Sequence, residues 1–190
     1  LMLSIINPAT EELIEKLEED NPQTIQNKFM KAQAKQKEWA NVSLSDKKQM
    51  IHRFKELLVK NKEELAQKLT LEMGKPISQS RNELNSVPAR INYFLDHVEP
   101  VLREEFVLPQ NSNPNEKITY EPLGVIANIS AWNYPYFVGS NVFIPALLTG
   151  NCVIYKPSEF ASLTGLEITK LLYKAGIPED VFISVIGGGS

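Results

Sequence analysis

The sequence predicts an α/β protein in which amphipathic helices precede a parallel sheet, and two observations carry this prediction. Residues 1–108 include 33 charged residues, whereas residues 109–190 include only 10. Glycine is distributed in the opposite way, because 8 of the 9 glycines lie after residue 108. A charge-rich stretch favours solvated helices, whereas a charge-poor, turn-rich stretch favours a buried strand–helix unit.

The first helix is expected to begin at Asn21-Pro22, because Asn is a capping residue and proline is favoured at the first helical position. From there, residues that are apolar with a single exception recur every three or four positions, which is the spacing of one helix face. These residues are Ile25, Phe29, Ala32, Gln36 and Trp39.

Two further helices follow. Ser45 is a candidate cap for the second helix, and Asn61 with Glu64 three residues later predicts a capping box for the third. Gly74 and Pro76 are expected to end that third helix, because glycine tolerates a left-handed cap and proline cannot continue the helical hydrogen bonds.

Two segments of the first part leave alternatives open. A fourth helix is expected over residues 81–102, with Pro88 implying either a kink or a later start. The apolar residues of segment 11–20 suit a helix, but Leu13 and Leu17 also suit one face of a strand.

The second part alternates between strand and helix patterns, which is typical of a parallel sheet with crossover helices. Strands are expected at residues 117–120, 125–129, 152–155 and 181–186, and helices at residues 136–148 and 163–175.

Ligands of such sheets bind at the carboxyl ends of the strands. Those ends are residues 130–135, 156–159 and 187–190, so three segments are expected to meet at one sheet edge.

Composition excludes several classes of function. The 190 residues carry 20 basic and 23 acidic side chains, so no positive excess exists to neutralise the phosphates of a nucleic acid. Cys152 is the only cysteine, and His52 and His97 lack metal-ligand spacing, so we expect no metal site. No apolar run reaches the ~20 residues that span a bilayer, and residues 1–6 are too short for a signal peptide. A cytoplasmic protein without membrane contact is therefore expected.

Several motifs together closely resemble the amino-terminal part of the aldehyde dehydrogenase superfamily, which depends on NAD(P). They are Ser130-Ala131-Trp132-Asn133-Tyr134-Pro135, Asn151-Cys152-Val153-Ile154-Tyr155-Lys156-Pro157-Ser158-Glu159, Glu121-Pro122-Leu123-Gly124-Val125, Gly187-Gly188-Gly189, Asn7-Pro8-Ala9-Thr10 and Glu72-Met73-Gly74-Lys75-Pro76. The resemblance covers the whole chain and implies a Rossmann-like sheet. One departure is Ala131, where the family usually has proline.

The resemblance implies that the protein oxidises an aldehyde to a carboxylic acid. In that chemistry a cysteine thiolate attacks the aldehyde, and a glutamate-activated water later hydrolyses the thioester. Asn133 would be the side-chain donor that stabilises the oxyanion. The alternative is that Asn133 only holds its loop through an Asx-type hydrogen bond.

The resemblance also assigns a cofactor cleft. Lys156 and Glu159 would hold the hydroxyls of the adenine-side ribose, although alone they suit an ordinary surface pair. Gly189 would let the cofactor lie against the backbone, and NAD is expected rather than NADP because a phosphate would meet the Glu159 carboxylate. Further cleft residues implied by the family are Ile129, Ser130 and Trp132, of which Trp132 suits a core position equally well.

Cys152 is assigned to the core, because a thiol in an apolar strand has a raised pKa and forms little thiolate. The family places its nucleophilic cysteine and its general base beyond these residues. The resemblance therefore implies that the chain is about the first 190 residues of a longer protein and is inactive alone.

The resemblance divides the chain into a cofactor-binding domain, residues 1–103 and 124–190, and a probable oligomerisation arm, residues 104–123. An extended, proline-interrupted ribbon suits pairing with another subunit, so a homo-oligomer is expected. Two rival functions stay open. One is a non-catalytic nucleotide-binding relative, and the other is a semialdehyde dehydrogenase that passes its acyl group to coenzyme A or phosphate.

Overall fold

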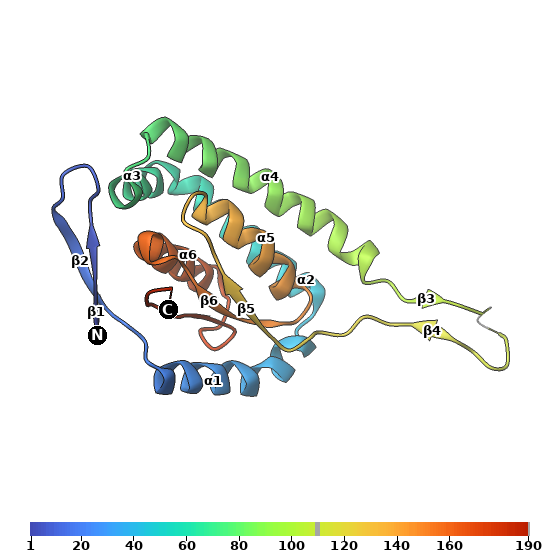
Figure 1. Ribbon diagram of the computed structural model, residues 1–190. Helices are drawn as coiled ribbons and strands as arrows, with labels where there is room; N and C mark the ends of the chain where they lie inside the picture. Colours follow the sequence, from blue (N-terminus) through green and yellow to red (C-terminus); the bar gives the residue numbers. More distant parts are fainter. Residues whose placement is uncertain (109–110, 190) are drawn as a thin grey trace.

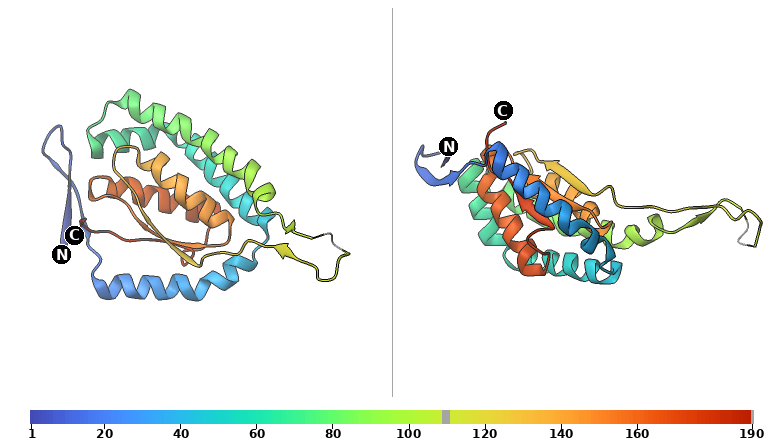
Figure 2. Two further views of the ribbon diagram at one scale, coloured as in Figure 1. Left: turned by 45° about the vertical axis from the view of Figure 1, so that its right-hand side comes forward. Right: turned by 90° about the horizontal axis from the view of Figure 1, so that it is seen from below.

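The computed structural model describes residues 1–108 and 111–189. It consists of an α/β body with an antiparallel hairpin at one end and a thin ribbon projecting from the other (Figure 1). The chain thus has a packed centre and two extended additions (Figure 2).

The sheet of the body contains three parallel strands in the order β5-β6-β7. They are β5 (Val125–Ile129), β6 (Cys152–Lys156) and β7 (Phe182–Ser184). The register places Ile129 opposite Lys156 and Tyr155 opposite Ser184, so the three carboxyl ends meet at one edge. This confirms the expected parallel sheet, with β7 shorter than expected.

Helices cover both faces of this sheet. The crossover helices α5 (Pro135–Leu148) and α6 (Ser162–Ala175) pack on one face, and α1 (Pro22–Asn41) packs on the other. Trp39 of α1 is buried, and its indole N–H donates to the carbonyl of Leu147 over 3.1 Å. The predicted apolar face of α1 therefore joins the core in its second half.

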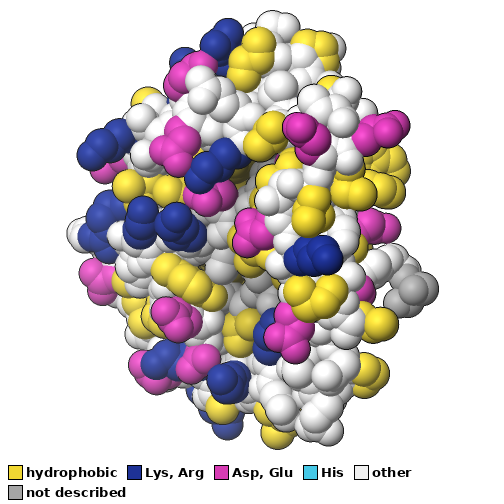
Figure 3. Space-filling view, turned by 90° about the vertical axis from the view of Figure 1, so that its left-hand side faces the viewer, with side chains coloured by type: hydrophobic (Ala, Val, Ile, Leu, Met, Phe, Trp, Pro, Cys, Tyr) yellow, Lys and Arg dark blue, Asp and Glu magenta, His cyan; other side chains and the backbone are white. Residues whose placement is uncertain are grey.

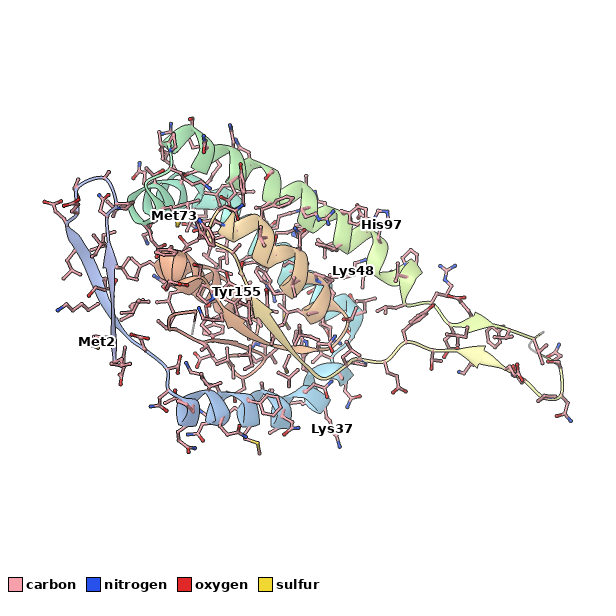
Figure 4. All side chains as sticks on the ribbon, viewed as in Figure 1. Met2, Lys37, Lys48, Met73, His97 and Tyr155 are labelled. Atoms are coloured by element: carbon pink, nitrogen blue, oxygen red, sulfur yellow. The ribbon has the colours of Figure 1, made fainter. Side chains whose placement is uncertain are left out.

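A second layer of helices lies outside α5 and α6. It consists of α2 (Leu44–Lys60), α3 (Lys62–Met73) and α4 (Ile77–Val101). Between the layers, the ring of Phe143 meets those of Phe54, Tyr155 and Phe182 edge to face. Tyr155 lies in the middle of the body, with its side chain surrounded by helices (Figure 4).

The ambiguous segment near the amino terminus is a strand. β1 (Met2–Ile6) and β2 (Leu13–Glu18) pair as an antiparallel hairpin that stands beside the body. The segment that follows is anchored two residues beyond β7, because the Asp20 N–H donates to the Ile186 carbonyl over 2.8 Å. In return, the Ile186 N–H donates to the Asp20 carboxylate, also over 2.8 Å.

The projecting ribbon pairs β3 (Glu105–Phe106) with β4 (Lys117–Ile118). The strand expected at residues 117–120 is shorter than predicted and belongs to this ribbon, not to the main sheet. The ribbon coincides with the proposed arm at 104–123, of which residues 109 and 110 lie outside the described part. Ser190, which belongs to the third predicted strand end, also lies outside the described part.

Three predicted helix boundaries were wrong. Ser43, not Ser45, caps α2, since its hydroxyl accepts from the Asp46 N–H. Asn61 forms no capping box, because it is nearly helical and donates its side-chain amide to the Leu57 carbonyl. α4 begins at Ile77, directly after the Gly74 turn, and continues through Pro88.

Among the described residues, no helix is both long enough and apolar enough to cross a membrane.

Candidate functional site

The carboxyl edge of the sheet brings together residues from all three strand ends. Ile129 and Lys156 are register partners, and the Ser130 N–H donates to the Lys156 carbonyl over 3.0 Å. A Cβ added to Gly189 would lie 3.6 Å from Oε1 of Glu159. The candidates predicted for the cofactor cleft therefore share one edge.

Lys156 and Glu159 form a loose, partly exposed pair. Their charged atoms are 3.9 Å apart, and the Lys156 ammonium also donates to the Pro157 carbonyl over 3.0 Å. Ser158 caps the short 3-10 turn that carries Glu159, and its hydroxyl donates to Oε2 of Glu159 over 3.2 Å. Within the described ranges Oε1 accepts no hydrogen bond, so this oxygen can accept one from a ligand.

The two large apolar candidates are exposed, whereas Ser130 is not. Ile129 is 78% exposed and Trp132 is 52% exposed, so Trp132 is not a core aromatic. The Ser130 hydroxyl is buried and lies 3.4 Å from a Cβ built on Gly139 of α5. The Ser130 side chain therefore faces the helix, and only its backbone can face the cleft.

A hollow of about 540 Å³ lies between this edge and the amino-terminal hairpin. On this side of the molecule, basic and acidic side chains are interspersed with apolar ones (Figure 3). Trp132 and Phe160, whose rings meet edge to face at 6.1 Å, stand at the hollow. Its lining consists of Ser4, Ile5, Ile6, Pro8, Glu72, Met73, Trp132, Glu159 and Phe160.

Asn133 lies on the loop between β5 and α5 and is exposed. Its Oδ1 accepts from the Tyr134 N–H over 3.1 Å, which is the local bond that a loop-holding role requires. An N–H must meet an acceptor, so the amide oxygen is the atom that faces Tyr134. The Nδ2 group finds no acceptor among the described residues, and it is free to donate to a ligand.

The helix that follows this loop, α5, has no cap of its own. Glu83 of α4 supplies one, since its Oε1 accepts from the N–H groups of Tyr136 and Phe137 over 2.8 and 3.2 Å. The Glu83 side chain is 0% exposed and pairs with Lys75 at 2.7 Å. Burial raises the pKa of the Glu83 carboxyl, and the Lys75 ammonium opposes that shift.

Helix α6 is capped in the same way by a carboxylate from α3. Glu72 accepts from the N–H groups of Leu163 and Thr164 over 2.6 and 2.8 Å, and from the Thr164 hydroxyl over 2.7 Å. Burial raises the pKa of the Glu72 carboxyl, and these hydrogen bonds oppose the shift.

Sequence reasoning missed Lys75, Glu72 and Glu83. A signal existed for the two acids, because each continues an apolar stripe at helical spacing. Glu72 follows Leu69 by three residues, and Glu83 precedes Val87 by four. An acid in such a stripe requires a buried partner.

Cys152 is buried at the start of β6, and burial raises its pKa to about 11. The assignment of this thiol to the core is confirmed. His52 lies 3.4 Å from Glu56 on α2, and His97 stacks on Tyr93. Across residues 1–108 and 111–189, no cluster of His, Cys, Asp and Glu has the size to hold a metal ion.

Solved structures with the same fold are numerous. An indole-3-acetaldehyde dehydrogenase is 32% identical, with a TM-score of 0.91 over 99% of this chain and 43% of its own. A succinate-semialdehyde dehydrogenase from Burkholderia pseudomallei is 26% identical, with a TM-score of 0.92 over 100% of this chain and 39% of its own. An NAD-dependent benzaldehyde dehydrogenase from Corynebacterium glutamicum is 25% identical, with a TM-score of 0.92 over 100% of this chain and 41% of its own.

The chain thus spans about two fifths of the length of these solved structures. The sequence model of the aldehyde dehydrogenase family matches residues 2–190, which is almost the whole chain. The match includes the sheet edge with Asn133, Lys156 and Glu159. It also includes α3 and α4, whose glutamates cap α5 and α6. This chain belongs to the aldehyde dehydrogenase family.

Proposed function

We propose that this chain provides the cofactor cleft and the oxyanion donor of an NAD(P)-dependent enzyme that oxidises an aldehyde to a carboxylic acid. The observation that carries the proposal is the Asn133 side chain. Its oxygen is bonded to its own loop, while its N–H₂ group points to no acceptor in the described part of the chain. An exposed donor fixed in this way suits a developing negative charge.

The residues of the edge fit a dinucleotide cofactor. The free Oε1 of Glu159 can accept from a ribose hydroxyl, and the Lys156 ammonium can donate to one. Gly189 lies beside Glu159, where a Cβ would stand 3.6 Å from Oε1. Ile129 and Trp132 offer exposed apolar surface next to this pair. These residues would hold the dinucleotide, and its nicotinamide would supply the hydride acceptor for the oxidation.

Asn133 acts on the aldehyde oxygen. As a thiolate attacks the carbonyl carbon, negative charge gathers on that oxygen, and the Asn133 Nδ2–H donates to it. The donor is held in place before the charge develops, so it stabilises the transition state more than the bound aldehyde. The thiolate and the general base would come from residues outside these 190, because Cys152 is buried with a raised pKa.

We further propose that NAD is preferred to NADP and that Glu159 sets the preference. A 2′-phosphate would place negative charge beside the Glu159 carboxylate and would remove the hydroxyl donor that this carboxylate uses. The Lys156 ammonium, 3.9 Å away, opposes part of this discrimination.

The ribbon at 104–123 is proposed as the arm that joins subunits of a homo-oligomer. Phe106, Val107, Ile118 and Tyr120 are all exposed on it, which is costly for a ribbon surrounded by water. The body, residues 1–103 and 124–190, would then be the cofactor-binding part.

The test uses the protein at the full length that its gene encodes. Asn133→Ala should lower kcat by about 10²–10³-fold and leave cofactor affinity within a few-fold of the parent, because the donor contributes to the transition state. Asn27→Ala, an exposed asparagine on α1, is the matched control. Parental turnover in Asn133→Ala, under conditions where chemistry limits, would contradict the proposal.

The isolated 190-residue chain should reduce no NAD⁺ when mixed with aldehydes, since it has no exposed thiol. NADH absorbance measures this directly, and turnover by the isolated chain would show that its own residues supply the nucleophile.

A further inference from the structure

We propose that Lys75 is a positioning residue for Asn133: its ammonium fixes the peptide plane on which the Asn133 side chain rests. Lys75 lies in the turn Gly74-Lys75-Pro76, which joins α3 to α4. It lies 58 residues before Asn133 in the sequence.

The Lys75 ammonium is held from three directions. It donates to Oε2 of Glu83 over 2.7 Å and to the Asn133 carbonyl over 2.9 Å. It also lies 4.7 Å from the centre of the Tyr134 ring, within the range of a cation–π contact. The Lys75 side chain is only 11% exposed, so water competes weakly for the bond to Glu83, whereas the bond to the Asn133 carbonyl is exposed.

The Asn133 carbonyl and the Tyr134 N–H belong to one peptide unit, which is planar and rigid. Lys75 binds the oxygen side of this plane. The Asn133 Oδ1 accepts from the N–H side of the same plane. Fixing the plane therefore fixes the direction of that N–H, and with it the side-chain amide whose Nδ2 is the proposed donor.

Glu83 holds the chain just after Asn133, at the start of α5. The carboxylate that binds Lys75 also accepts from the N–H groups of Tyr136 and Phe137 at the start of α5. The loop that carries Asn133 is thus held at its centre by Lys75 and at its end by Glu83, with both side chains bonded to each other.

The turn that presents Lys75 is itself constrained. Gly74 has φ +70°, a left-handed conformation that strains other residues, and a Cβ there would come within 2.6 Å of Pro8. Pro76 is the N-cap residue that precedes α4. A lysine between these two residues has little freedom of backbone, which sets the direction of its side chain.

This inference rests on the proposed role of Asn133, and a double-mutant cycle separates the two. In the full-length protein, Lys75→Met keeps the aliphatic stem and removes the ammonium. It should lower kcat about tenfold, less than the 10²–10³-fold expected of Asn133→Ala, and leave the KM for NAD⁺ unchanged. The double variant should be no slower than Asn133→Ala alone, because Lys75 acts only through Asn133.

Additive effects in the double variant, or parental kcat in Lys75→Met beside a slow Asn133→Ala, would overturn the positioning role and leave the oxyanion donor intact. Parental kcat in Asn133→Ala would overturn both. Lys68→Met is the matched control, because Lys68 is also ion-paired on α3 but binds Glu64 and Glu167 away from the loop.

Lys75→Met leaves a buried Glu83 carboxylate without its cation, so this variant can fail to fold. Lys75→Met combined with Glu83→Gln removes both charges and keeps an amide oxygen for the α5 N–H groups. Thermal unfolding should show that this double variant is folded. Its kcat should still be about tenfold below the parental value. Adding these two substitutions to Asn133→Ala should cause no further loss of kcat. A folded pair with parental kcat would overturn the inference.

Discussion

Helices α5 and α6 start at the same sheet edge, and neither provides its own cap. A glutamate from the outer helix layer caps each one, Glu83 for α5 and Glu72 for α6. They differ in the partner of the carboxylate. Glu83 binds the Lys75 ammonium, whereas Glu72 binds the Thr164 hydroxyl and, within the described residues, no cation.

This difference shows how one structural device serves two purposes. At α6 the carboxylate only satisfies the N–H groups of a buried helix end, which is a contribution to stability. At α5 the added cation extends the network to the loop that carries Asn133. The predictions below test where the two caps behave alike and where they diverge.

Removing the paired carboxylate should have the largest effect on stability. Glu83→Ala leaves the Lys75 ammonium without its counter-ion at 11% exposure and leaves two helix N–H groups unsatisfied. We expect a loss of about 3–5 kcal/mol in the free energy of unfolding, measured by urea denaturation. A loss below that of Glu72→Ala would mean that the buried cation adds nothing.

Removing the unpaired carboxylate should cost less. Glu72→Ala takes an acceptor from the N–H groups of Leu163 and Thr164 but leaves no buried cation behind. The expected loss is about 2–3 kcal/mol, by the same urea measurement. The kcat of the folded Glu72→Ala variant should equal the parental value, because α6 does not carry Asn133. A lower kcat would show that the α6 cap affects the loop that carries Asn133.

The pH dependence of unfolding should contain a contribution from the Glu72 carboxylate. Burial raises the pKa of Glu72 above its ordinary value of 4.5, so the folded protein binds the proton more tightly than the unfolded chain. The free energy of unfolding should therefore fall as the pH rises above 4.5 through the raised pKa. Glu72→Gln should flatten this fall in part, since Glu83 keeps its share; an unchanged slope would contradict it.

A third glutamate at this edge gives the smallest expected effect. Glu159 is not buried against a helix end, and its carboxylate is open to a ligand. Glu159→Ser should shift the ratio of kcat/KM for NAD⁺ over NADP⁺ about tenfold toward NADP⁺, which corresponds to about 1.4 kcal/mol. Glu179→Ser, a remote acidic residue, is the control; an unchanged ratio in Glu159→Ser would place its carboxylate away from the ribose.

Local patterns predicted the sheet and most of the helices. The strand at 125–129 and the helix cap at Asn21 are confirmed, because both depend on residues close in sequence. The caps of α5 and α6 could not be predicted, since their donors and acceptors lie 53 and 92 residues apart. The same applies to Lys75, which reaches a carbonyl 58 residues away.

The ribbon shows a different limit. Its strand at Lys117–Ile118 has the composition of a sheet strand, and only its partner decides which sheet it joins. The roles of the site residues, the domain boundaries and the preference for NAD stay predictions, because each depends on a ligand or a subunit.

The two hydrogen bonds between Asp20 and Ile186 have a mechanical consequence. The Asp20 N–H donates to the Ile186 carbonyl and the Asp20 carboxylate accepts from the Ile186 N–H, while Lys28 adds an ion pair to Asp20 at 2.6 Å and a hydrogen bond to the Ser184 carbonyl. A force applied to the amino-terminal hairpin would therefore reach the segment that follows β7 through these bonds. Tension at the β1–β2 hairpin would in this way be coupled to the glycine segment, whose Gly189 lies beside Glu159.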